Sequence, residues 1–318
     1  MPARRALITG ITGQDGSYLA ELLQGEGTEL VGLVRPGEPG PEGVATVTGD
    51  LLEPASLRRA VGAVRPDELY HLAAPTFVPA SWEDPTTTVA AIAGATAALL
   101  AACVALPAPE RPRVWVATSS EVFGDSGEHP QHERSPMRPR TPYGVAKLAA
   151  HGLVGALRER HGLFACSGIT FNHESPRRPE HFLPRKVTRA AAAIAVGLEG
   201  EVALGSLDAV RDWSHAEDVM RCAILALRAG EPADYVVASG QGRTVGELVA
   251  TAFAAAGVRD PDGHVRVDPA FVRPPEATPP VGDPTRARER LGWAPRWTFE
   301  AMIGEMVAAD LQALRPGP

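Results

Sequence analysis

Cysteine is scarce in this sequence, and basic residues do not outnumber acidic ones. The three cysteines of 318 residues, Cys103, Cys166 and Cys222, lie far apart in apolar stretches. We therefore expect buried thiols in a reducing compartment rather than a disulfide framework. No Cys/His spacing is typical of a zinc site, so we expect no metal. The 38 acidic and 31 basic residues give a net charge of -7, which argues against nucleic acid as the main partner.

Long apolar runs are also few. Two arginines precede the apolar residues 6–8, but that stretch leads at once into a glycine-rich turn and is too short for a signal peptide. No other stretch reaches the roughly 18 apolar residues that a membrane span needs. We therefore expect a cytoplasmic protein with no membrane partner.

Short apolar runs alternate with helical patterns in the first half of the chain. The expected strands are 6–8, 30–34, 44–47, 68–72, 114–117 and 164–171, and the expected helices are 17–24, 87–106 and 143–160. Apolar strands joined by helices are typical of a parallel sheet covered on both faces. The sequence thus predicts an α/β fold with a Rossmann-type doubly wound parallel sheet. After residue 171 the pattern becomes irregular, which predicts a smaller mixed α/β C-terminal lobe closed by a helix at 299–314.

A glycine-rich turn, Gly10-Ile-Thr-Gly13-Gln-Asp-Gly16, follows the first strand and opens a helix. Glycines there let the backbone turn tightly and approach a pyrophosphate at the helix N-terminus. Arg35, after the second strand, stands where an NAD site carries an acid, so it favours the 2′-phosphate of NADP; a solvated arginine is the alternative. Asp50 and Leu51, after the third strand, are candidates for contact with the adenine, and a simple turn aspartate is the alternative.

A tyrosine and a lysine, Tyr143 and Lys147, lie four residues apart and so share one helix face. They follow Ser119-Ser120-Glu121 at the end of a strand, where active sites of open α/β sheets collect. A neighbouring cation favours the phenolate, so we expect Lys147 to lower the Tyr143 pKa from near 10 and make the tyrosine a base. This combination predicts a catalytic site.

The sequence resembles the GDP-mannose 4,6-dehydratases, a family of the extended short-chain dehydrogenases/reductases. The similar segments are GITGQDGSYLAE from Gly10, FNHESPRR from Phe171, RKVTRA from Arg185, LGSLDAVRDWSHAED from Leu204 and GDPTRARERLGW from Gly282. They span nearly the whole chain. The resemblance implies a lyase that converts GDP-mannose to GDP-4-keto-6-deoxymannose by internal hydride transfer through NADP. Residues 1–171 would form mainly the NADP-binding domain, and 172–318 mainly the nucleotide-sugar lobe, with some chain crossing back to the sheet.

The resemblance also implies a role for each candidate residue. Tyr143 takes the proton of the sugar 4-hydroxyl, and Glu121 removes the C5 proton and assists loss of the 6-hydroxyl as water. Ser119 hydrogen-bonds the 4-oxygen, and Lys147 holds the nicotinamide ribose. The cofactor candidates are Gly10, Thr12, Gly13, Gln14, Asp15, Gly16, Arg35, Asp50, Leu51, Leu72, Ala73, Ala74, Tyr143, Lys147, His173 and Arg178. The substrate candidates are Ser120, Asn172, Arg185, Lys186, Gly205, Arg211, Arg273 and Glu276.

Some positions depart from the family. Ser119 replaces the usual threonine, Thr87 a cofactor-contacting tyrosine, Pro75-Thr76 a Gln-Ser pair, and Arg35-Pro36 a pair of arginines. The loop 35–44 is also short. That loop helps to assemble tetramers in the family, so we expect a homodimer built from the helices that begin near Thr87 and Tyr143.

Three alternatives stay open. A GDP-sugar epimerase or a 4-keto-sugar reductase would keep Ser119, Tyr143 and Lys147 but would not need the carboxyl of Glu121. A dehydratase for another GDP-sugar would keep all four. A non-catalytic NADP-binding protein commonly lacks the tyrosine or the lysine, and this sequence has both.

Overall fold

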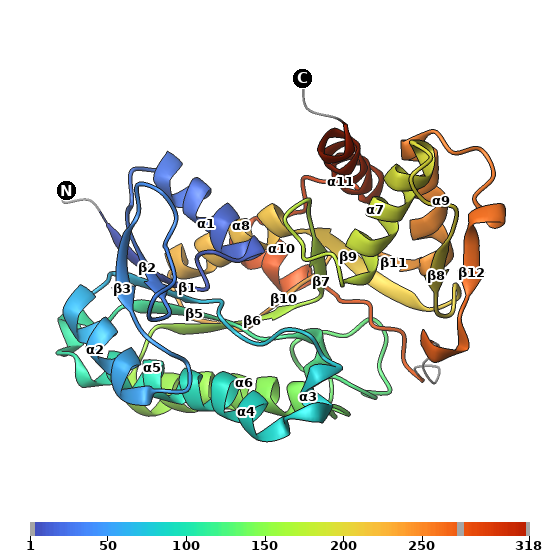
Figure 1. Cartoon of the computed structure of the whole chain (residues 1–318). Coiled ribbons are helices and arrows are strands. Elements are labelled where there is room, and N and C mark those ends of the chain that lie inside the picture. Colours follow the sequence, from blue (N-terminus) through green and yellow to red (C-terminus); the bar gives the residue numbers. More distant parts are fainter. Residues whose placement is uncertain (1–3, 272–276, 316–318) are drawn as a thin grey trace.

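A parallel sheet of seven strands forms the centre of the computed structural model, which describes residues 4–271 and 277–315 (Figure 1). Its order is β10-β6-β5-β4-β1-β2-β3, which confirms the Rossmann-type prediction. The strands are β1 Arg5–Thr9, β2 Glu29–Val34, β3 Ala45–Thr48, β4 Glu68–His71, β5 Arg113–Ala117, β6 Ala165–Thr170 and β10 Tyr235–Val237.

Helices cover both faces of this sheet (Figure 1). The first face carries α1 Gln14–Gly25, α8 Ala216–Arg228 and α10 Thr285–Leu291; the second carries α2 Pro54–Val64, α5 Ala95–Ala105 and α6 Pro142–His161. Neighbouring residues of a strand point to opposite faces. Accordingly, Ile8 packs in the core beneath α1 and α8, whereas Leu7 packs in the core beneath α2 and α5. Near-continuous apolar strands are needed because both faces are buried.

The segment 85–105 differs from expectation in two ways. It is one long helical run, but a π-helical stretch, Ala90–Gly94, separates α4 Pro85–Val89 from α5. It is also long and apolar enough to cross a membrane by composition alone, with a mean hydropathy of 2.1, which corrects the expectation that no segment is. In the structure 56% of this window is buried, with Leu99 and Cys103 in the core beneath the sheet.

The smaller lobe lies beyond one end of the sheet (Figure 1). It holds a three-stranded sheet, β11-β9-β7, and a two-stranded sheet, β12-β8. Its strands are β7 Asn172–Glu174, β8 Val202–Leu204, β9 Val210–His215, β11 Gly242–Thr244 and β12 Val265–Val267; its helices are α7 Leu183–Ala195, α9 Val245–Ala256 and α11 Phe299–Leu314. The remaining short helices are α3 Ala80–Glu83, η2 Ala108–Glu110, η3 Ser120–Val122, η4 Asp262–His264 and η5 Pro269–Phe271. The chain crosses back, because α8, β10 and α10 belong to the large sheet domain.

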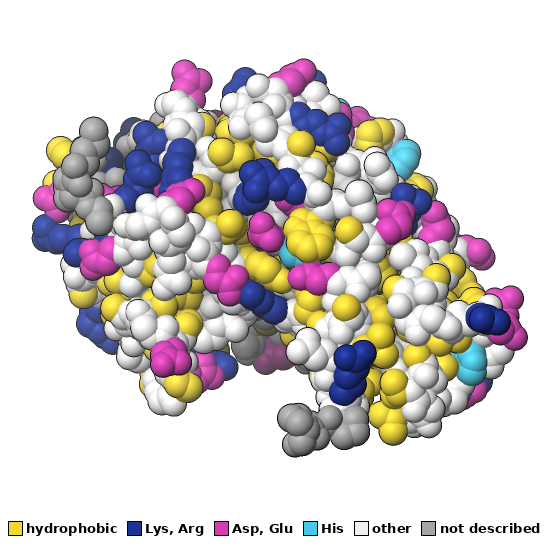
Figure 2. All heavy atoms as spheres, turned by 90° about the horizontal axis from the view of Figure 1, so that it is seen from above, with side chains coloured by type: hydrophobic (Ala, Val, Ile, Leu, Met, Phe, Trp, Pro, Cys, Tyr) yellow, Lys and Arg dark blue, Asp and Glu magenta, His cyan; other side chains and the backbone are white. Residues whose placement is uncertain are grey.

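The surface and the cysteines are consistent with the composition. On the face seen from above, Lys and Arg side chains alternate with Asp and Glu rather than forming one basic area (Figure 2). Cys103, Cys166 and Cys222 are free and buried, as expected. Within residues 4–271 and 277–315, no group of three His, Cys, Asp or Glu side chains is placed to hold a metal ion.

Candidate active site

The turn between β1 and α1 has room for glycine only. Gly10 has a φ of +75°, and a Cβ there would lie 2.9 Å from the Ala73 nitrogen. A Cβ on Gly16 would lie 2.1 Å from the Gly10 oxygen. Gly13 is the N-cap of α1 and has no side chain to cap it, so the free N–H groups of the first turn face outward, where an anion can bind. This turn therefore fits the pyrophosphate of a dinucleotide.

A buried hydroxyl fixes the chain after β4 beside that turn. Thr9 Oγ1 accepts hydrogen bonds from the N–H groups of Leu72 at 3.2 Å and Ala73 at 3.1 Å, and it lies 2.8 Å from His71 Nδ1. Burial, together with the Lys147 charge, lowers the pKa of His71 to about 3, so this ring stays neutral. Thr9 and His71 were missed from the sequence because each sits inside an apolar strand.

Of the residues expected around the adenine end, Arg35 is exposed, whereas Asp50 and Leu51 are half-buried. Arg35 directly follows β2, is 69% exposed and forms an ion pair with Glu38. The Oδ1 atom of Asp50 accepts a hydrogen bond from the N–H of Leu52 at 2.8 Å, which is the turn role given above as the alternative. Contact of Arg35 or Asp50 with a cofactor stays a prediction.

The acid Glu121 is held against the start of α6. Ser119 follows β5, and its Oγ accepts a hydrogen bond from the Glu121 N–H at 3.3 Å. Thr141 caps α6 by accepting from the Gly144 N–H at 2.9 Å, and its hydroxyl donates to Glu121 Oε2 at 3.3 Å. A Cβ on Gly144 would lie 2.7 Å from the backbone carbonyl oxygen of Glu121. Thr141 and Gly144 were not predicted, although Thr-Pro before a helix is a capping signal.

Tyr143 and Lys147 are both buried on the inner face of α6. Lys147 Nζ donates to the Ala117 oxygen at 2.7 Å and lies 5.6 Å from the centre of the Tyr143 ring. Burial raises the pKa of Tyr143 to about 12; the nearby Ser119 hydroxyl lowers it and the Glu121 carboxylate raises it. Burial lowers the pKa of Lys147 to about 8. The expectation that Lys147 brings the Tyr143 pKa below 10 is therefore wrong for the protein without cofactor, because desolvation of the phenol dominates its pKa.

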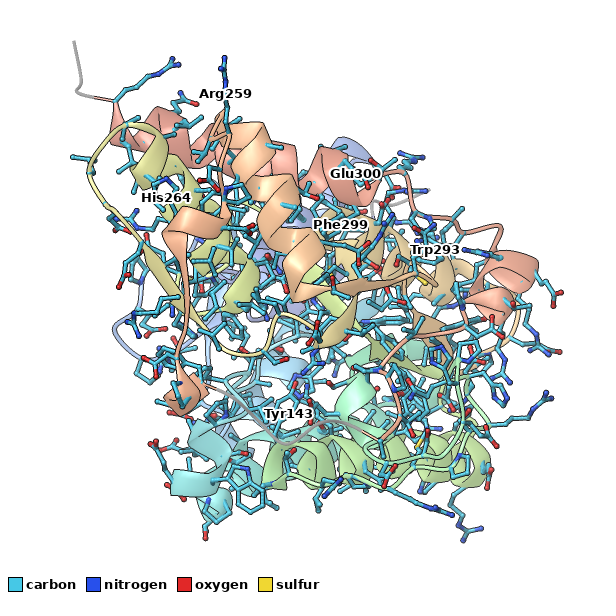
Figure 3. All side chains as sticks on the ribbon, turned by 90° about the vertical axis from the view of Figure 1, so that its right-hand side faces the viewer. Tyr143, Arg259, His264, Trp293, Phe299 and Glu300 are labelled. Carbon is cyan, nitrogen blue, oxygen red and sulfur yellow. The ribbon has the colours of Figure 1, made fainter. Side chains whose placement is uncertain are left out.

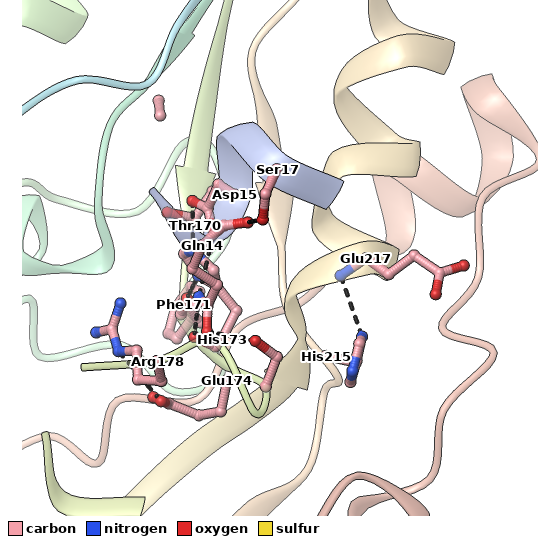
Figure 4. Close-up of polar contacts among 12 residues, drawn as sticks. Gln14, Asp15, Ser17, Thr170, Phe171, His173, Glu174, Arg178, His215 and Glu217 are labelled. Atoms are coloured by element: carbon pink, nitrogen blue, oxygen red, sulfur yellow. Dashed lines mark hydrogen bonds and ion pairs between the residues drawn. The ribbon is translucent and has the colours of Figure 1, made fainter. Parts of the chain in front are cut away.

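A charged network joins β7 and the loop after it to α1 (Figure 4). His173 Nε2 lies 2.9 Å from Asp15 Oδ2, and His173 Nδ1 lies 2.8 Å from the Phe171 oxygen. Arg178 Nε lies 3.2 Å from Glu174 Oε2, a pair in which Glu174 is almost wholly buried. Burial alone would lower the pKa of His173, but the charge and hydrogen bond of Asp15 raise it. Both ring nitrogens of His173 are thus engaged within the chain.

One predicted substrate residue is paired with an acid of the smaller lobe. Arg185, on α7, forms an ion pair with Asp310 of α11, whose side chain is fully buried. Without Arg185, Asp310 would be an unpaired buried charge. That Arg185 also neutralises the substrate diphosphate stays a prediction. Lys186 donates to the Ala203 oxygen at 2.7 Å and lies 4.4 Å from the Phe271 ring centre.

The other substrate candidates are placed as follows. Ser120 begins η3 beside Ser119. Asn172 is exposed at the start of β7, in register with Trp213 of β9, which is a core residue. A Cβ on Gly205 would lie 2.4 Å from the Phe271 oxygen, and Arg211 Nη1 donates to the Val210 oxygen at 2.6 Å. Arg273 and Glu276 lie outside the described residues.

A cleft of about 510 Å³ lies elsewhere, between β9, β11 and α11. Phe299 and Glu300 line it, and Figure 3 shows both far from Tyr143. It contains none of the candidate residues, so its size does not mark it as the active site.

Comparison with known proteins gives a consistent result. The profile of the family "GDP-mannose 4,6 dehydratase" matches residues 7–306. A GDP-mannose 4,6-dehydratase of Yersinia enterocolitica is 40% identical over 97% of this chain and 94% of its own length. GDP-mannose 4,6 dehydratase 2 of Arabidopsis thaliana is 42% identical over 98% of this chain and 88% of its own. Among solved structures, RMD from Pseudomonas aeruginosa, complexed with NADPH, has a TM-score of 0.83 at 27% identity and covers 98% of this chain and 100% of its own.

Proposed function

Because the chain belongs to the GDP-mannose 4,6-dehydratase family, we propose that its site converts GDP-mannose to GDP-4-keto-6-deoxymannose. The observation that carries this proposal is the carboxyl of Glu121, held by Thr141 beside Tyr143 at the end of β5. A dehydratase needs a base for the 4-hydroxyl and, separately, a group that serves as base and then acid at C5 and C6. An epimerase or reductase does not need the second group.

The enzyme uses a nicotinamide cofactor, and we propose NADP. The turn Gly10–Gly16 and the open N-terminus of α1 suit its pyrophosphate, and Arg35 suits its 2′-phosphate. When bound there, the oxidised cofactor would supply the hydride acceptor for C4 and the hydride donor for C6, and its positive charge would favour a phenolate at Tyr143. Residues 1–171 would bind mainly this cofactor, and 172–318 mainly the nucleotide sugar.

The side chains supply the proton transfers. Tyr143 takes the proton of the 4-hydroxyl as C4 is oxidised to the ketone, and Ser119 donates a hydrogen bond to that oxygen. The ketone acidifies the C5 hydrogen, which Glu121 removes as a proton. Glu121 then gives this proton to the departing 6-hydroxyl, so that water leaves and a C5–C6 double bond forms. Hydride addition at C6 and a proton at C5, equal in number to the one that Tyr143 took from the 4-hydroxyl and releases again, complete a reaction whose net change is the loss of one water.

Mass spectrometry of GDP-mannose incubated with the protein and NADP tests the proposal. The expected product is lighter by one water, with no accumulation of NADPH. Glu121→Gln should keep cofactor binding yet lose dehydration, whereas Tyr143→Phe should stop oxidation at C4. Unchanged mass with exchange of deuterium into the sugar ring would replace the proposal with an epimerase. Turnover of a different GDP-sugar only would replace the substrate.

We also propose a homodimer that buries one side of α4–α5 and α6. On α6 the exposed residues Val145, Ala149, Gly152 and Ala156 recur every three or four positions, and Ala90, Gly94 and Ala101 are exposed on the neighbouring helical run. Such small residues let two helix pairs approach closely. A Cβ on Gly152 would meet no atom within 4 Å, so Gly152→Glu should leave the protomer folded and shift the mass found by light scattering to that of a monomer. Gly62→Glu on α2, where a Cβ also meets no atom within 4 Å, is the control.

The cysteines give information about the cellular compartment. Three free cysteines, all buried and unpaired by disulfides, suit the reducing cytoplasm. We propose a cytoplasmic enzyme, which fractionation of cells expressing the tagged chain would test.

A further inference from the structure

The loop 172–178 binds the first turns of α1 through side chains (Figure 4). The contacts are His173 Nε2 to Asp15 Oδ2 at 2.9 Å, Ser175 Oγ to Gln14 Oε1 at 2.8 Å, and Arg177 Nη1 to Ser17 Oγ at 2.9 Å. The loop 172–178 includes β7 of the smaller lobe and the residues after it, whereas α1 begins at the glycine turn. The contacts therefore tie the smaller lobe to the turn that suits the pyrophosphate.

The hydrogen bonds of His173 fix its protonation state. Its Nδ1 faces the Phe171 oxygen at 2.8 Å, and its Nε2 faces the Asp15 carboxylate at 2.9 Å. Neither a carbonyl nor a carboxylate oxygen can donate, so both ring nitrogens must carry a proton. The side chains of His173 and Asp15 are only 14% and 22% exposed, so water screens this pair weakly.

We propose that Asp15 and His173 form a lasting carboxylate–imidazolium pair that locks the loop 172–178 onto the glycine turn, and that both are positioning residues. The consequence for cofactor affinity rests on the proposed function; the pair itself does not. Both ring nitrogens of His173 are engaged within the chain, so we assign its ring to positioning, and the cofactor contact that the family resemblance implies would come from its backbone.

The pair also balances charge near the catalytic residues. The groups facing it are Gln14 on α1, Glu174 and Arg178 on its own loop, and Tyr143 and Lys147 on α6. Gln14 Nε2 donates to Asp15 Oδ1 and to the His173 oxygen, both at 3.1 Å. The Asp15 charge raises the pKa of both Tyr143 and Lys147. Loss of the His173 proton would leave that charge unopposed and raise the Tyr143 pKa further, so that less of the phenolate forms at a given pH.

The pH range of the pair follows from the two pKa directions. Burial would raise the Asp15 pKa, but His173 lowers it below 3.8; the His173 pKa lies above 6.5. Stability from His173 is therefore full below pH 6.5 and is lost as the pH rises through its folded pKa. Stability from Asp15 is full above pH 3.8 and is lost as the pH falls through its folded pKa. The pair is complete between these limits.

NMR of the full chain with ¹⁵N-labelled histidine, without cofactor, tests the pair directly. At pH 6.5, where an ordinary imidazole is half protonated, His173 should show two N–H protons protected from exchange with water. A single N–H, or titration at or below pH 6.5, would overturn the proposal. This readout does not depend on which reaction the enzyme performs.

A double-mutant cycle tests the positioning role through the NADP dissociation constant. Asp15→Asn and His173→Gln should each raise it about 10- to 100-fold, the range for a lost hydrogen bond to a charged group. The double variant should bind no more weakly than the weaker single variant, because both changes remove the same contact. Multiplying effects would show two independent cofactor ligands and refute the positioning role. His161→Gln, at an exposed histidine that ends α6, is the control. Wild-type protein that binds no NADP would refute the cofactor assignment and leave the NMR result to decide the pair.

Discussion

Gly16→Ala is the sharpest test of the cofactor turn. The new Cβ would start 2.1 Å from the Gly10 oxygen and 2.5 Å from the Ile11 Cα. Real Cβ contacts are essentially never under 3.0 Å, so the turn or the helix must move by at least 3.0 - 2.1 = 0.9 Å. Both atoms it meets are backbone, so no side-chain rotation relieves the contact. The displacement falls on the N–H groups that would face the pyrophosphate.

The expected cost has two parts. Overpacking of this kind costs about 1–3 kcal/mol of folding stability, and a 1 Å misplacement can reduce activity about 100-fold. Gly25→Ala is the matched control on the same helix, because a Cβ there meets no atom within 4 Å; it should be neutral or stabilise by about 0.4–1 kcal/mol. Urea unfolding gives the first quantity, and NADP titration with kcat gives the second. If Gly16→Ala binds NADP like Gly25→Ala and is as stable, the turn does not hold the cofactor.

Two further predictions concern buried charge. Arg185→Ala should cost about 3–5 kcal/mol of unfolding free energy, because it leaves Asp310 buried and unpaired; unchanged stability would contradict this role. A large rise in the KM for GDP-mannose would show that Arg185 also binds the substrate diphosphate, and an unchanged KM would show that it does not. The Lys147 pKa of about 8 lies below its ordinary value of 10.5. Between these two pH values the unfolded chain binds more protons than the folded chain, so Lys147 makes the unfolding free energy of the wild type rise with pH in this range. Lys147→Met should lose that component in unfolding experiments from pH 7 to 10 together with its activity, and an unchanged slope would contradict the buried ammonium.

How far the sequence predicted the site depended on how local each signal was. The glycine turn could be predicted because its seven residues are consecutive in the sequence. The helix cap Thr141 could also have been predicted, because a proline follows it directly. The ion pair of Arg185 was not predicted because its partner, Asp310, lies 125 residues away, where no periodicity connects them. The pKa of Tyr143 was misjudged because spacing on a helix reveals a neighbouring cation but not the loss of water around the phenol. The His173–Asp15 pair was likewise beyond local reading, since β7 and α1 meet only in the fold.

The return of the chain to the large sheet sets an order of events during synthesis. Helix α8, strand β10 and Trp293 all contribute to the core on the α1 face of the sheet, although β1 to β6 are complete by residue 170. The opposite face is covered by helices that end at residue 161. A nascent chain can therefore cover that face early. On the α1 face, Ile8, Leu19 and Trp115 stay uncovered until their core partners emerge more than a hundred positions later. At about 5–20 residues per second, that apolar face stays open for several seconds or more on the ribosome, a natural stage for binding by a chaperone.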